Sequence, residues 1–237
     1  MSAGTILIVG AGPGLGLSIA RTFGREGFGV ALVGRSPERL GQLVARLVED
    51  GIEAAGFVAD ATDRDALTEA IAAAKVRFGP IDVLEYSPIA PAADPASLAA
   101  TVLTAEVAEQ AIGLLALGAV ASVQAVLPDM LRQGSGTILI TTGGSAIQHQ
   151  PFLAAFSMGG GAARNYALTL HAALAGTGVY AASVCIALGI RKGDPEGDPD
   201  LLATRYLALH KAREQAELQI LARSQLEDLR EFADRSG

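Results

Sequence analysis

Short apolar runs alternate along the chain with segments whose apolar residues recur at helical spacing. The runs have the length of strands and carry apolar residues on both faces, as strands do when helices cover a sheet on both sides. Six strands are predicted, at residues 5–10, 29–34, 54–59, 81–86, 136–142 and 179–187. Helices are predicted at residues 16–27, 37–51 and 63–79, in a long stretch ending near Met130, and at 152–175. We therefore expect an α/β fold, a doubly wound parallel sheet with helices on both faces.

The last part of the chain changes character. Residues 193–199 read GDPEGDP, which predicts a loop, and residues 200–230 are charged and helix-forming. One face of that helix carries Leu202, Tyr206, Leu209 and Arg213, which predicts an amphipathic lid or a helix that supports an oligomer. No seventh strand is predicted. We expect one domain, in which residues 1–192 form the sheet with its helices and residues 193–237 form a C-terminal helical tail or lid.

A glycine-rich stretch, VGAGPGLG at residues 9–16, joins the first predicted strand to the first helix. Glycine permits a tight turn and lets a phosphate approach the backbone, and the following helix N-terminus offers N–H groups and the positive end of its dipole. This context favours a dinucleotide-binding turn of the Rossmann type over a purely structural turn. The residues expected to hold the pyrophosphate are Gly10, Gly12, Pro13, Gly14, Leu15 and Gly16.

The end of the second strand discriminates between the two pyridine nucleotides. An acidic residue there would bind the adenosine ribose hydroxyls and favour NAD, whereas this chain has Gly34, Arg35 and Ser36. Arg35 can pair with a 2′-phosphate through charge-assisted hydrogen bonds, and Ser36 can donate another. We expect NADP as the cofactor, with NAD as the alternative.

Charge and composition exclude several classes of partner. The formal net charge is −7, so neither nucleic acid nor an anionic membrane surface is an expected partner. The apolar run at residues 111–127 is interrupted by Gly113, Gly118 and Gln124, which predicts a buried helix rather than a membrane span. No metal site is expected, because the three histidines are widely spaced. A single cysteine, Cys185, and the absence of a leader favour a cytoplasmic location.

With these features the chain resembles the short-chain dehydrogenase/reductase family over about residues 4 to 190. VGAGPGLG is similar to the family's TGxxxGxG, and ADATD at residues 59–63 is similar to its DVTD segment. The resemblance implies that Asp60 holds the adenine amino group and that Ala61 lies alongside. It also implies an oxidoreductase that forms a homodimer or homotetramer through the helices around residues 105–130 and 155–175.

The departures from the family fall on its chemistry. Aligned on the flanking motifs, the family's catalytic asparagine, serine, tyrosine and lysine correspond to Leu115, Gly143, Phe156 and Gly160. A phenyl ring has no proton to donate, and glycine carries no charge to orient the nicotinamide ribose. A positioned general acid contributes about 10²–10⁴ in rate, so carbonyl reduction by the family's own route is expected to be negligible.

Four other residues are candidates for the missing chemistry. Thr142 and Ser145 flank Gly143, and Glu85 and Tyr86 end the fourth predicted strand, at the edge where open α/β sheets bind ligands. Each has a structural alternative, as a packing residue or a strand-end cap. A carboxyl that faces a pocket would have a raised pKa, which makes Glu85 beside Tyr86 the pair of greatest interest.

Three hypotheses about function remain open. The first is an NADP(H)-dependent oxidoreductase with a non-standard proton donor and a small-molecule substrate. The second is a non-catalytic NADP-binding protein with a regulatory or scaffold role. The third is a repurposed, non-redox enzyme. The triplet Gly159–Gly161 also has two explanations: close approach by the cofactor or a neighbouring helix, or a helix that starts only near Gly161.

Overall fold

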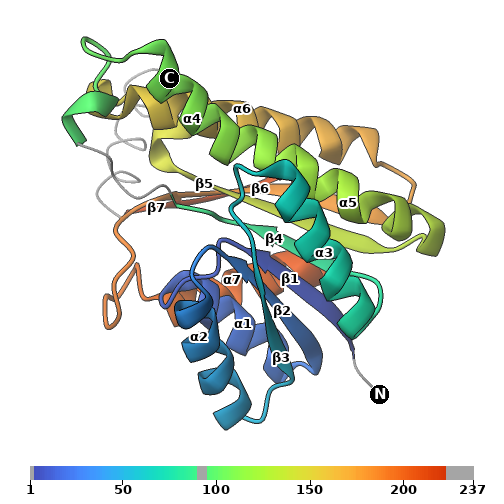
Figure 1. Cartoon of the computed structure of the whole chain (residues 1–237). Coiled ribbons are helices and arrows are strands. Elements are labelled where there is room, and N and C mark those ends of the chain that lie inside the picture. Colours follow the sequence, from blue (N-terminus) through green and yellow to red (C-terminus); the bar gives the residue numbers. More distant parts are fainter. Residues whose placement is uncertain (1–2, 90–94, 223–237) are drawn as a thin grey trace.

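A computed structural model of the chain describes residues 3–89 and 95–222. Its centre is a parallel sheet of seven strands in the order β3-β2-β1-β4-β5-β6-β7 (Figure 1). The strands are β1 (Gly4–Val9), β2 (Phe28–Gly34), β3 (Ala54–Val58), β4 (Val83–Tyr86), β5 (Gly136–Gly143), β6 (Val179–Ala187) and β7 (Glu217–Leu221). The predicted fold class and all six predicted strands are confirmed.

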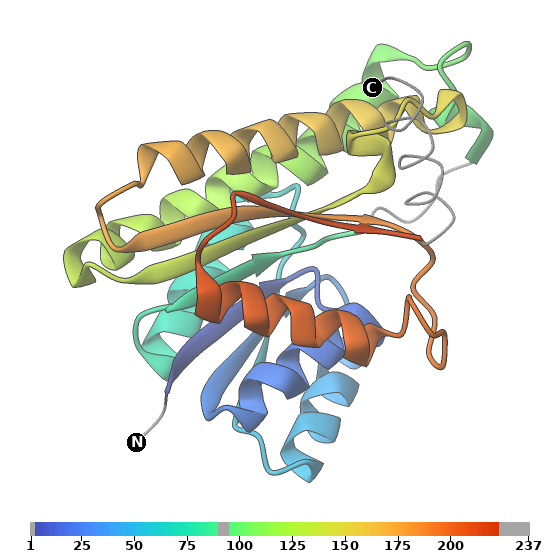
Figure 2. The ribbon, with the colours of Figure 1, turned by 180° about the vertical axis from the view of Figure 1, so that it is seen from behind.

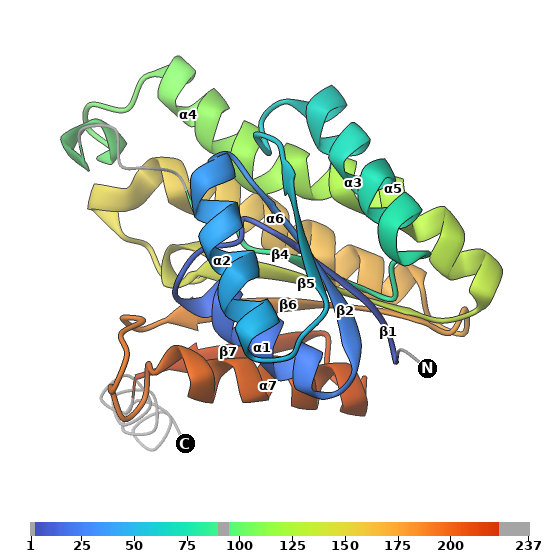
Figure 3. The ribbon, with the colours of Figure 1, turned by 60° about the horizontal axis from the view of Figure 1, so that its bottom comes forward.

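Helices cover both faces of the sheet. One face carries α1 (Leu15–Arg25), α2 (Pro37–Glu49) and α7 (Pro199–Ala212), which lie together on one side in Figure 3. The other face carries α3 (Arg64–Phe78), α4 (Ala105–Ile112), α5 (Gly118–Gln133) and α6 (Ala154–Ala173). Each face buries its own aliphatic core against the sheet, because alternate residues of every strand point to opposite sides.

The seventh strand corrects the sequence prediction. β7 pairs with β6 in parallel, from Ser183 opposite Glu217 to Ala187 opposite Leu221. It lies inside the segment that was predicted to continue as a helix, because its five residues, ELQIL, carry no long apolar run and are flanked by charged, helix-forming residues. The helix itself ends at Ala212, where Arg213 adopts φ of 54°. The remainder of the predicted helix, residues 223–230, lies outside the described residues.

The α7 helix is a core helix, so the prediction of a lid is wrong for it. Leu202, Tyr206 and Leu209 are buried. The view from behind shows α7 lying beside α1 against the sheet (Figure 2). The hydroxyl of Ser18 in α1 donates to Asp200 at the start of α7, with an O···O distance of 2.5 Å. The apolar stripe that the sequence displays is therefore the stripe that any globular helix turns toward its core.

The long helical region before β5 contains one turn of π-helix. Residues Gly113–Leu117 form this turn between α4 and α5. The buried hydroxyl of Tyr86 donates to the carbonyl oxygen of Leu114 within it. Within the described residues, Ala105–Gln133 is one helical stretch long and apolar enough to cross a membrane by length and composition alone. In this fold α5 packs against α3, and α4 packs against α6.

The three glycines of α6 lie inside the helix, which begins at Ala154 rather than near Gly161. A Cβ on Gly159 would stand 2.6 Å from the carbonyl oxygen of Ala111 in α4. A Cβ on Gly161 would meet no atom within 4 Å. Close approach of a neighbouring helix is therefore the reason for Gly159, whereas Gly161 has no such contact.

Replacing these two glycines by alanine should change the free energy of unfolding in opposite directions. Gly159→Ala should lower the free energy of unfolding by about 1–3 kcal/mol, because its methyl group would force the backbones of α4 and α6 apart. Gly161→Ala should raise it by about 0.5–1 kcal/mol through the helix propensity of alanine. Urea unfolding followed by circular dichroism measures both changes. Equal effects of the two variants would contradict the close helix contact.

Candidate functional site

The site lies at the carboxyl ends of the strands, where the winding of the sheet reverses. β1 stands between β2 and β4, and a crevice opens outside the strand ends at such a point. The turn after β1 meets the segment after β4 there, because a Cβ on Gly10 would stand 2.4 Å from Pro88 Cα. Gly10 also adopts φ of 94°, a conformation that other residues rarely adopt. Glycine is therefore required at this position by the fold itself.

Gly12 and Gly14 are not required by contacts within the protein. A Cβ on either would meet no atom within 4 Å. Helix α1 begins directly after them, at Leu15, and no side chain caps its first turn. Gly16 packs on Ala11, with 3.2 Å between a Cβ built on Gly16 and Ala11 Cα. The turn, which also contains Pro13, thus presents open backbone in front of an uncapped helix N-terminus, and this arrangement fits a pyrophosphate.

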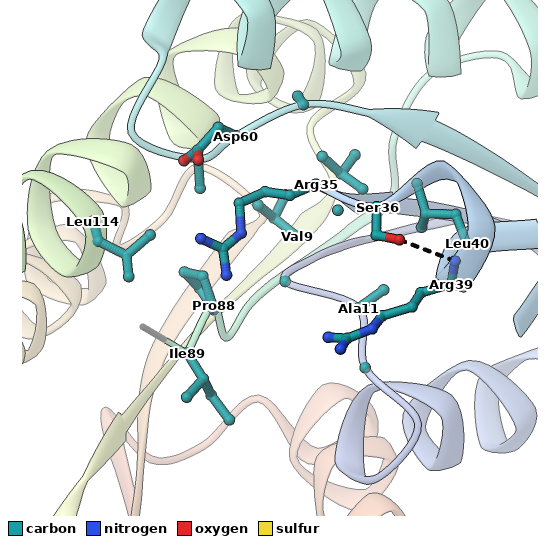
Figure 4. Close-up of a pocket in the computed structure, with 16 residues that line it drawn as sticks. Val9, Ala11, Arg35, Ser36, Arg39, Leu40, Asp60, Pro88, Ile89 and Leu114 are labelled. Atoms are coloured by element: carbon teal, nitrogen blue, oxygen red, sulfur yellow. Dashed lines mark hydrogen bonds between the residues drawn. The ribbon is translucent and has the colours of Figure 1, made fainter. Parts of the chain in front are cut away.

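A cavity of about 480 Å³ extends from this turn across the ends of β2 and β3. Figure 4 shows Arg35 and Arg39 reaching toward it, with Asp60 and Leu114 on the far side. The predicted residues Gly10, Gly12, Arg35, Ser36, Asp60 and Ala61 all line it. The structure therefore brings the turn, the end of β2 and the segment after β3 together around one space.

Arg39 is a cavity residue that the sequence analysis missed. Ser36 is the N-cap of α2, and its Oγ accepts a hydrogen bond of 3.2 Å from the backbone N–H of Arg39. This cap sets the first turn of α2 so that the side chains of Arg35 and Arg39 both line the cavity. The spacing of two arginines, four residues apart across a helix start, was the available signal. The cavity thus carries two guanidinium groups at the end of β2.

Asp60 is held in place by its own loop. Its Oδ1 accepts hydrogen bonds from the backbone N–H of Thr62, at 2.9 Å, and from the Thr62 hydroxyl, at 2.7 Å. Partial burial acts to raise the pKa of Asp60, but the Thr62 hydrogen bonds and the charge of Arg35 outweigh it and lower the pKa below its usual value. Asp60 is therefore an ionised acceptor with one oxygen already engaged.

Glu85 and Tyr86 do not form a pair, because consecutive strand residues point to opposite faces of a sheet. Tyr86 faces α5, with its hydroxyl committed to Leu114, and burial raises its pKa. Glu85 faces α7 and is fully buried. Its carboxyl oxygens accept hydrogen bonds from the Ser87 and Thr141 hydroxyls, each at 2.8 Å. The Thr141 hydroxyl also lies 2.8 Å from the Tyr206 hydroxyl of α7.

Burial gives Glu85 an unusual acidity. It raises the carboxyl pKa to about 7, although the hydrogen bonds from Thr141 and Ser87 act to lower it. The sequence analysis named Glu85 but missed the hydroxyls that hold it. Ser87 could have been found from its i+2 spacing on the same strand face, whereas nothing in the sequence connects Thr141 or Tyr206 to this acid. The network exists only because the sheet brings β4, β5 and α7 together.

The other two candidates lie on either side of Gly143. Thr142 is buried, and Ser145 is half-buried in the short helix Gly144–Ala146. Gly143 is exposed, and a Cβ on it would meet no atom within 4 Å. The Cys185 thiol of β6 donates to the Gly143 carbonyl oxygen, with a distance of 3.4 Å. The end of β5 therefore offers space rather than a hydroxyl at residue 143.

Phe156 and Gly160 stand on the α6 helix. Phe156 packs in a small apolar cluster with Leu98, Ala111 and Ala155. A Cβ on Gly160 would make an ordinary contact with Ala146, at 3.4 Å. Leu115 lies in the π-helical turn, with its Cδ1 3.1 Å from a Cβ built on Gly159. These residues supply apolar surface and space but no ionisable group. Among the described residues, no three His, Cys, Asp or Glu side chains gather as a metal site would need.

Comparison with known proteins gives a consistent family. The family model for the short chain dehydrogenase matches residues 4–190. An uncharacterized oxidoreductase of Staphylococcus saprophyticus is 32% identical over 203 residues, covering 85% of this chain and 84% of its own. The serine 3-dehydrogenase of Agrobacterium fabrum is 34% identical over 186 residues, covering 77% and 70%.

A solved structure agrees in fold. That of L-sorbose reductase from Gluconobacter frateurii, complexed with NADPH and L-sorbose, matches with a TM-score of 0.80 at 19% identity. The match covers 94% of this chain and 95% of the reductase. The family match spans the sheet from β1 to β6 and includes the glycine-rich turn, so this chain belongs to the short-chain dehydrogenase family.

Proposed function

We propose that the protein is an NADP(H)-binding oxidoreductase that acts on a small molecule with a non-standard proton donor. The observation that carries this proposal is the cavity beside the glycine-rich turn, which Arg35, Arg39, Asp60 and Ala61 all line. When bound, the nicotinamide supplies or accepts a hydride. We expect the protein in the cytoplasm.

In this proposal, different residues of the chain bind different parts of the cofactor. The backbone of Gly12 and Gly14 and the N-terminus of α1 hold the pyrophosphate, because open space and uncapped N–H groups meet there. Arg35, Arg39 and the Ser36 hydroxyl bind the 2′-phosphate of NADP, for which two guanidinium groups are suited. Asp60 accepts from the adenine amino group, and Ala61 lies alongside. NAD remains the alternative, because it lacks only the phosphate that the arginines favour.

The apolar and glycine residues at the family's catalytic positions support a second function. A protein with Phe156 and Gly160 in place of a phenol and an ammonium group could bind NADP(H) without turnover, as a regulatory or scaffold subunit. The two functions share the cofactor site and differ only in chemistry. Thr142 and Ser145 remain candidates for hydroxyl donors beside the open space at Gly143.

Binding and turnover measured on the same sample separate these functions. We expect NADPH to bind saturably in a fluorescence titration, and we expect its absorbance to fall when ketones, enones or imines are added. Imines and enones depend least on a phenolic acid and should react first. Saturable binding without oxidation of NADPH by any of the panel would favour the non-catalytic function. Failure to bind either nucleotide would contradict both.

The arginines at the end of β2 provide a test of cofactor preference. Arg35→Ala should raise the Kd for NADPH by roughly 10- to 150-fold, because a hydrogen-bonded charge contributes about 1.5–3 kcal/mol, and should leave the Kd for NADH nearly unchanged. Arg39→Ala should act in the same direction. Arg46→Ala is the matched control, since it lies in the last turn of α2, outside the cavity. Equal loss of NADPH and NADH affinity would show that Arg35 does not read the phosphate.

We also propose that the protein forms a homodimer or homotetramer through α4, α5 and α6. Three apolar side chains are exposed along this region, namely Leu117 in the π-helical turn, Leu131 in α5 and Met158 in α6. We expect these side chains to lie in the contact between chains.

Light scattering at micromolar concentration should give the mass of at least two chains. Leu117→Lys and Met158→Lys should shift the mass toward one chain, because a charge in an apolar interface is costly. Val76→Lys is the matched control, on an equally apolar and more exposed residue of α3, and it should leave the mass unchanged. A single-chain mass for the unaltered protein would overturn this interface.

A further inference from the structure

The fold places a carboxyl group where an aliphatic side chain would be expected. In the sheet, Glu85 of β4 stands between Ile8 of β1 and Leu139 of β5. All three side chains are fully buried. Burying an ionised carboxylate among aliphatic groups is unfavourable unless it is paired or protonated. Packing alone therefore does not explain a glutamate at this position.

No cation offsets this carboxyl. Among the described residues no Lys, Arg or His forms an ion pair with Glu85, and its partners are the Ser87 and Thr141 hydroxyls. The titratable groups near this network are Tyr206 of α7 and Cys185 of β6, and burial raises the pKa of both. β1 and β5 contribute aliphatic side chains and Thr141. Every neighbour is thus neutral at physiological pH. Burial raises the Glu85 pKa to about 7, and no neighbouring positive charge offsets that effect.

The two hydroxyls that hold Glu85 are both half-buried, but they differ in their other partners. The Thr141 hydroxyl is engaged twice, by Glu85 and by the fully buried Tyr206 hydroxyl. The Ser87 hydroxyl, which is half-buried, has Glu85 as its side-chain partner. Ser87 also adjoins the glycine-rich turn, since its N–H donates to Val9 and its carbonyl carbon lies 2.8 Å from a Cβ built on Gly10. Ser87 is therefore the partner of Glu85 that adjoins the glycine-rich turn, at the carboxyl edge of the sheet.

We propose that Glu85 is the proton reservoir of this site and that it delivers its proton through the Ser87 hydroxyl to a substrate held at the carboxyl edge of β4 and β5. This inference rests on the proposed oxidoreductase function and names the proton source for it. Glu85 acts through Ser87, so it is a positioning residue, and Ser87 is the group that would touch the substrate. Proton donation is thereby assigned to the sheet, because Phe156 and Gly160 of α6 have no proton to donate.

The step balances in atoms and electrons. The carbon of a C=O or C=N group would receive its hydride from the reduced nicotinamide, which the proposed function names as the reductant. The developing anion on oxygen or nitrogen takes the hydroxyl proton of Ser87, and Ser87 takes the carboxyl proton of Glu85 as its own leaves. The products are the alcohol or amine, an oxidised nicotinamide, an unchanged serine and a Glu85 carboxylate. The Ser87 and Thr141 hydroxyls then hydrogen-bond to that carboxylate until solvent returns a proton.

A spectroscopic experiment tests the reservoir without any substrate. Infrared difference spectra of the NADPH-saturated protein between roughly pH 6 and roughly pH 8 should show a buried carboxylic acid band that is lost as pH rises. Glu85→Gln should remove this band. Glu85→Leu, which matches Ile8 and Leu139, serves the same purpose if the glutamine variant fails to fold. A wild-type protein without a protonated buried carboxyl at roughly pH 6 would overturn the proposal.

The exit is tested by two variants that each remove one hydroxyl from the network. Ser87→Ala should slow hydrogen–deuterium exchange of the Glu85 carboxyl on the order of tenfold or more, whereas Tyr206→Phe should leave the exchange rate almost unchanged. A merely structural network would respond equally to both substitutions. Equal slowing by the two variants, or slowing by Tyr206→Phe alone, would overturn the assignment of Ser87 as the exit.

Turnover provides the third readout, with phenanthrenequinone as the probe carbonyl and NADPH as reductant. Wild-type kcat should fall as pH rises through about 7, because Glu85 is protonated below that pKa and ionised above it. Glu85→Gln and Ser87→Ala should lower kcat by about 10²–10⁴ with the Kd for NADPH unchanged, and Tyr206→Phe should keep most of it. Loss of NADPH binding by the wild type would instead reject the proposed function. NADPH that binds but is never oxidised by the wild type would likewise reject the oxidoreductase function, whereas oxidation at an equal rate by the wild type and Glu85→Gln would reject the reservoir alone.

Discussion

The contact between Gly10 and the Ser87–Pro88 backbone is the constraint on which the site depends. These two segments follow neighbouring strands, β1 and β4, on either side of the point where the winding of the sheet reverses. Because a Cβ at residue 10 would stand 2.4 Å from Pro88 Cα, the segments can meet only as bare backbone. Their contact fixes the glycine-rich turn on one side and the Glu85–Ser87 strand end on the other. The glycine-rich turn and a buried acid are thereby held in one rigid frame.

Much of this frame could be predicted from the sequence, because it depends on local patterns. Runs of apolar residues predict the buried parallel strands, and apolar residues at helical spacing predict the helices between them. The spacing of glycines predicts the turn before α1. β7 could not be predicted, since its five residues, ELQIL, are interrupted by polar side chains and lie within a charged, helix-forming stretch. Arg39 was missed because a helix-start arginine ordinarily faces solvent. Its place in the cavity depends on the Ser36 cap and on how α2 leaves β2.

The Glu85 network shows where local reasoning reaches its limit. The sequence identified an acid at a strand end but joined it to Tyr86, which the alternation of a strand sends to the opposite face. The true partners are 2, 56 and 121 residues away, as Ser87, Thr141 and, through Thr141, Tyr206. Only the parallel pairing of β4 with β5 and the packing of α7 beneath them bring these hydroxyls together. Tertiary contacts of this kind leave no periodic trace in a single sequence.

In the proposed function, β4 supplies the proton-donating group that α6 lacks. Phe156 sits in an apolar cluster and Gly160 adds no charge, so α6 offers surface to pack against but no proton. Directly across the sheet edge, β4 buries a carboxyl without a cation, which holds its pKa near neutrality instead of near that of an exposed glutamate. A group with a pKa near the working pH is protonated often enough to donate and acidic enough to release its proton, whereas an unassisted phenol is a much weaker acid. The desolvation that makes Glu85 costly for the fold is the same physical effect that suits it to this chemistry, and both disappear together if the carboxyl is exposed to water or paired with a cation.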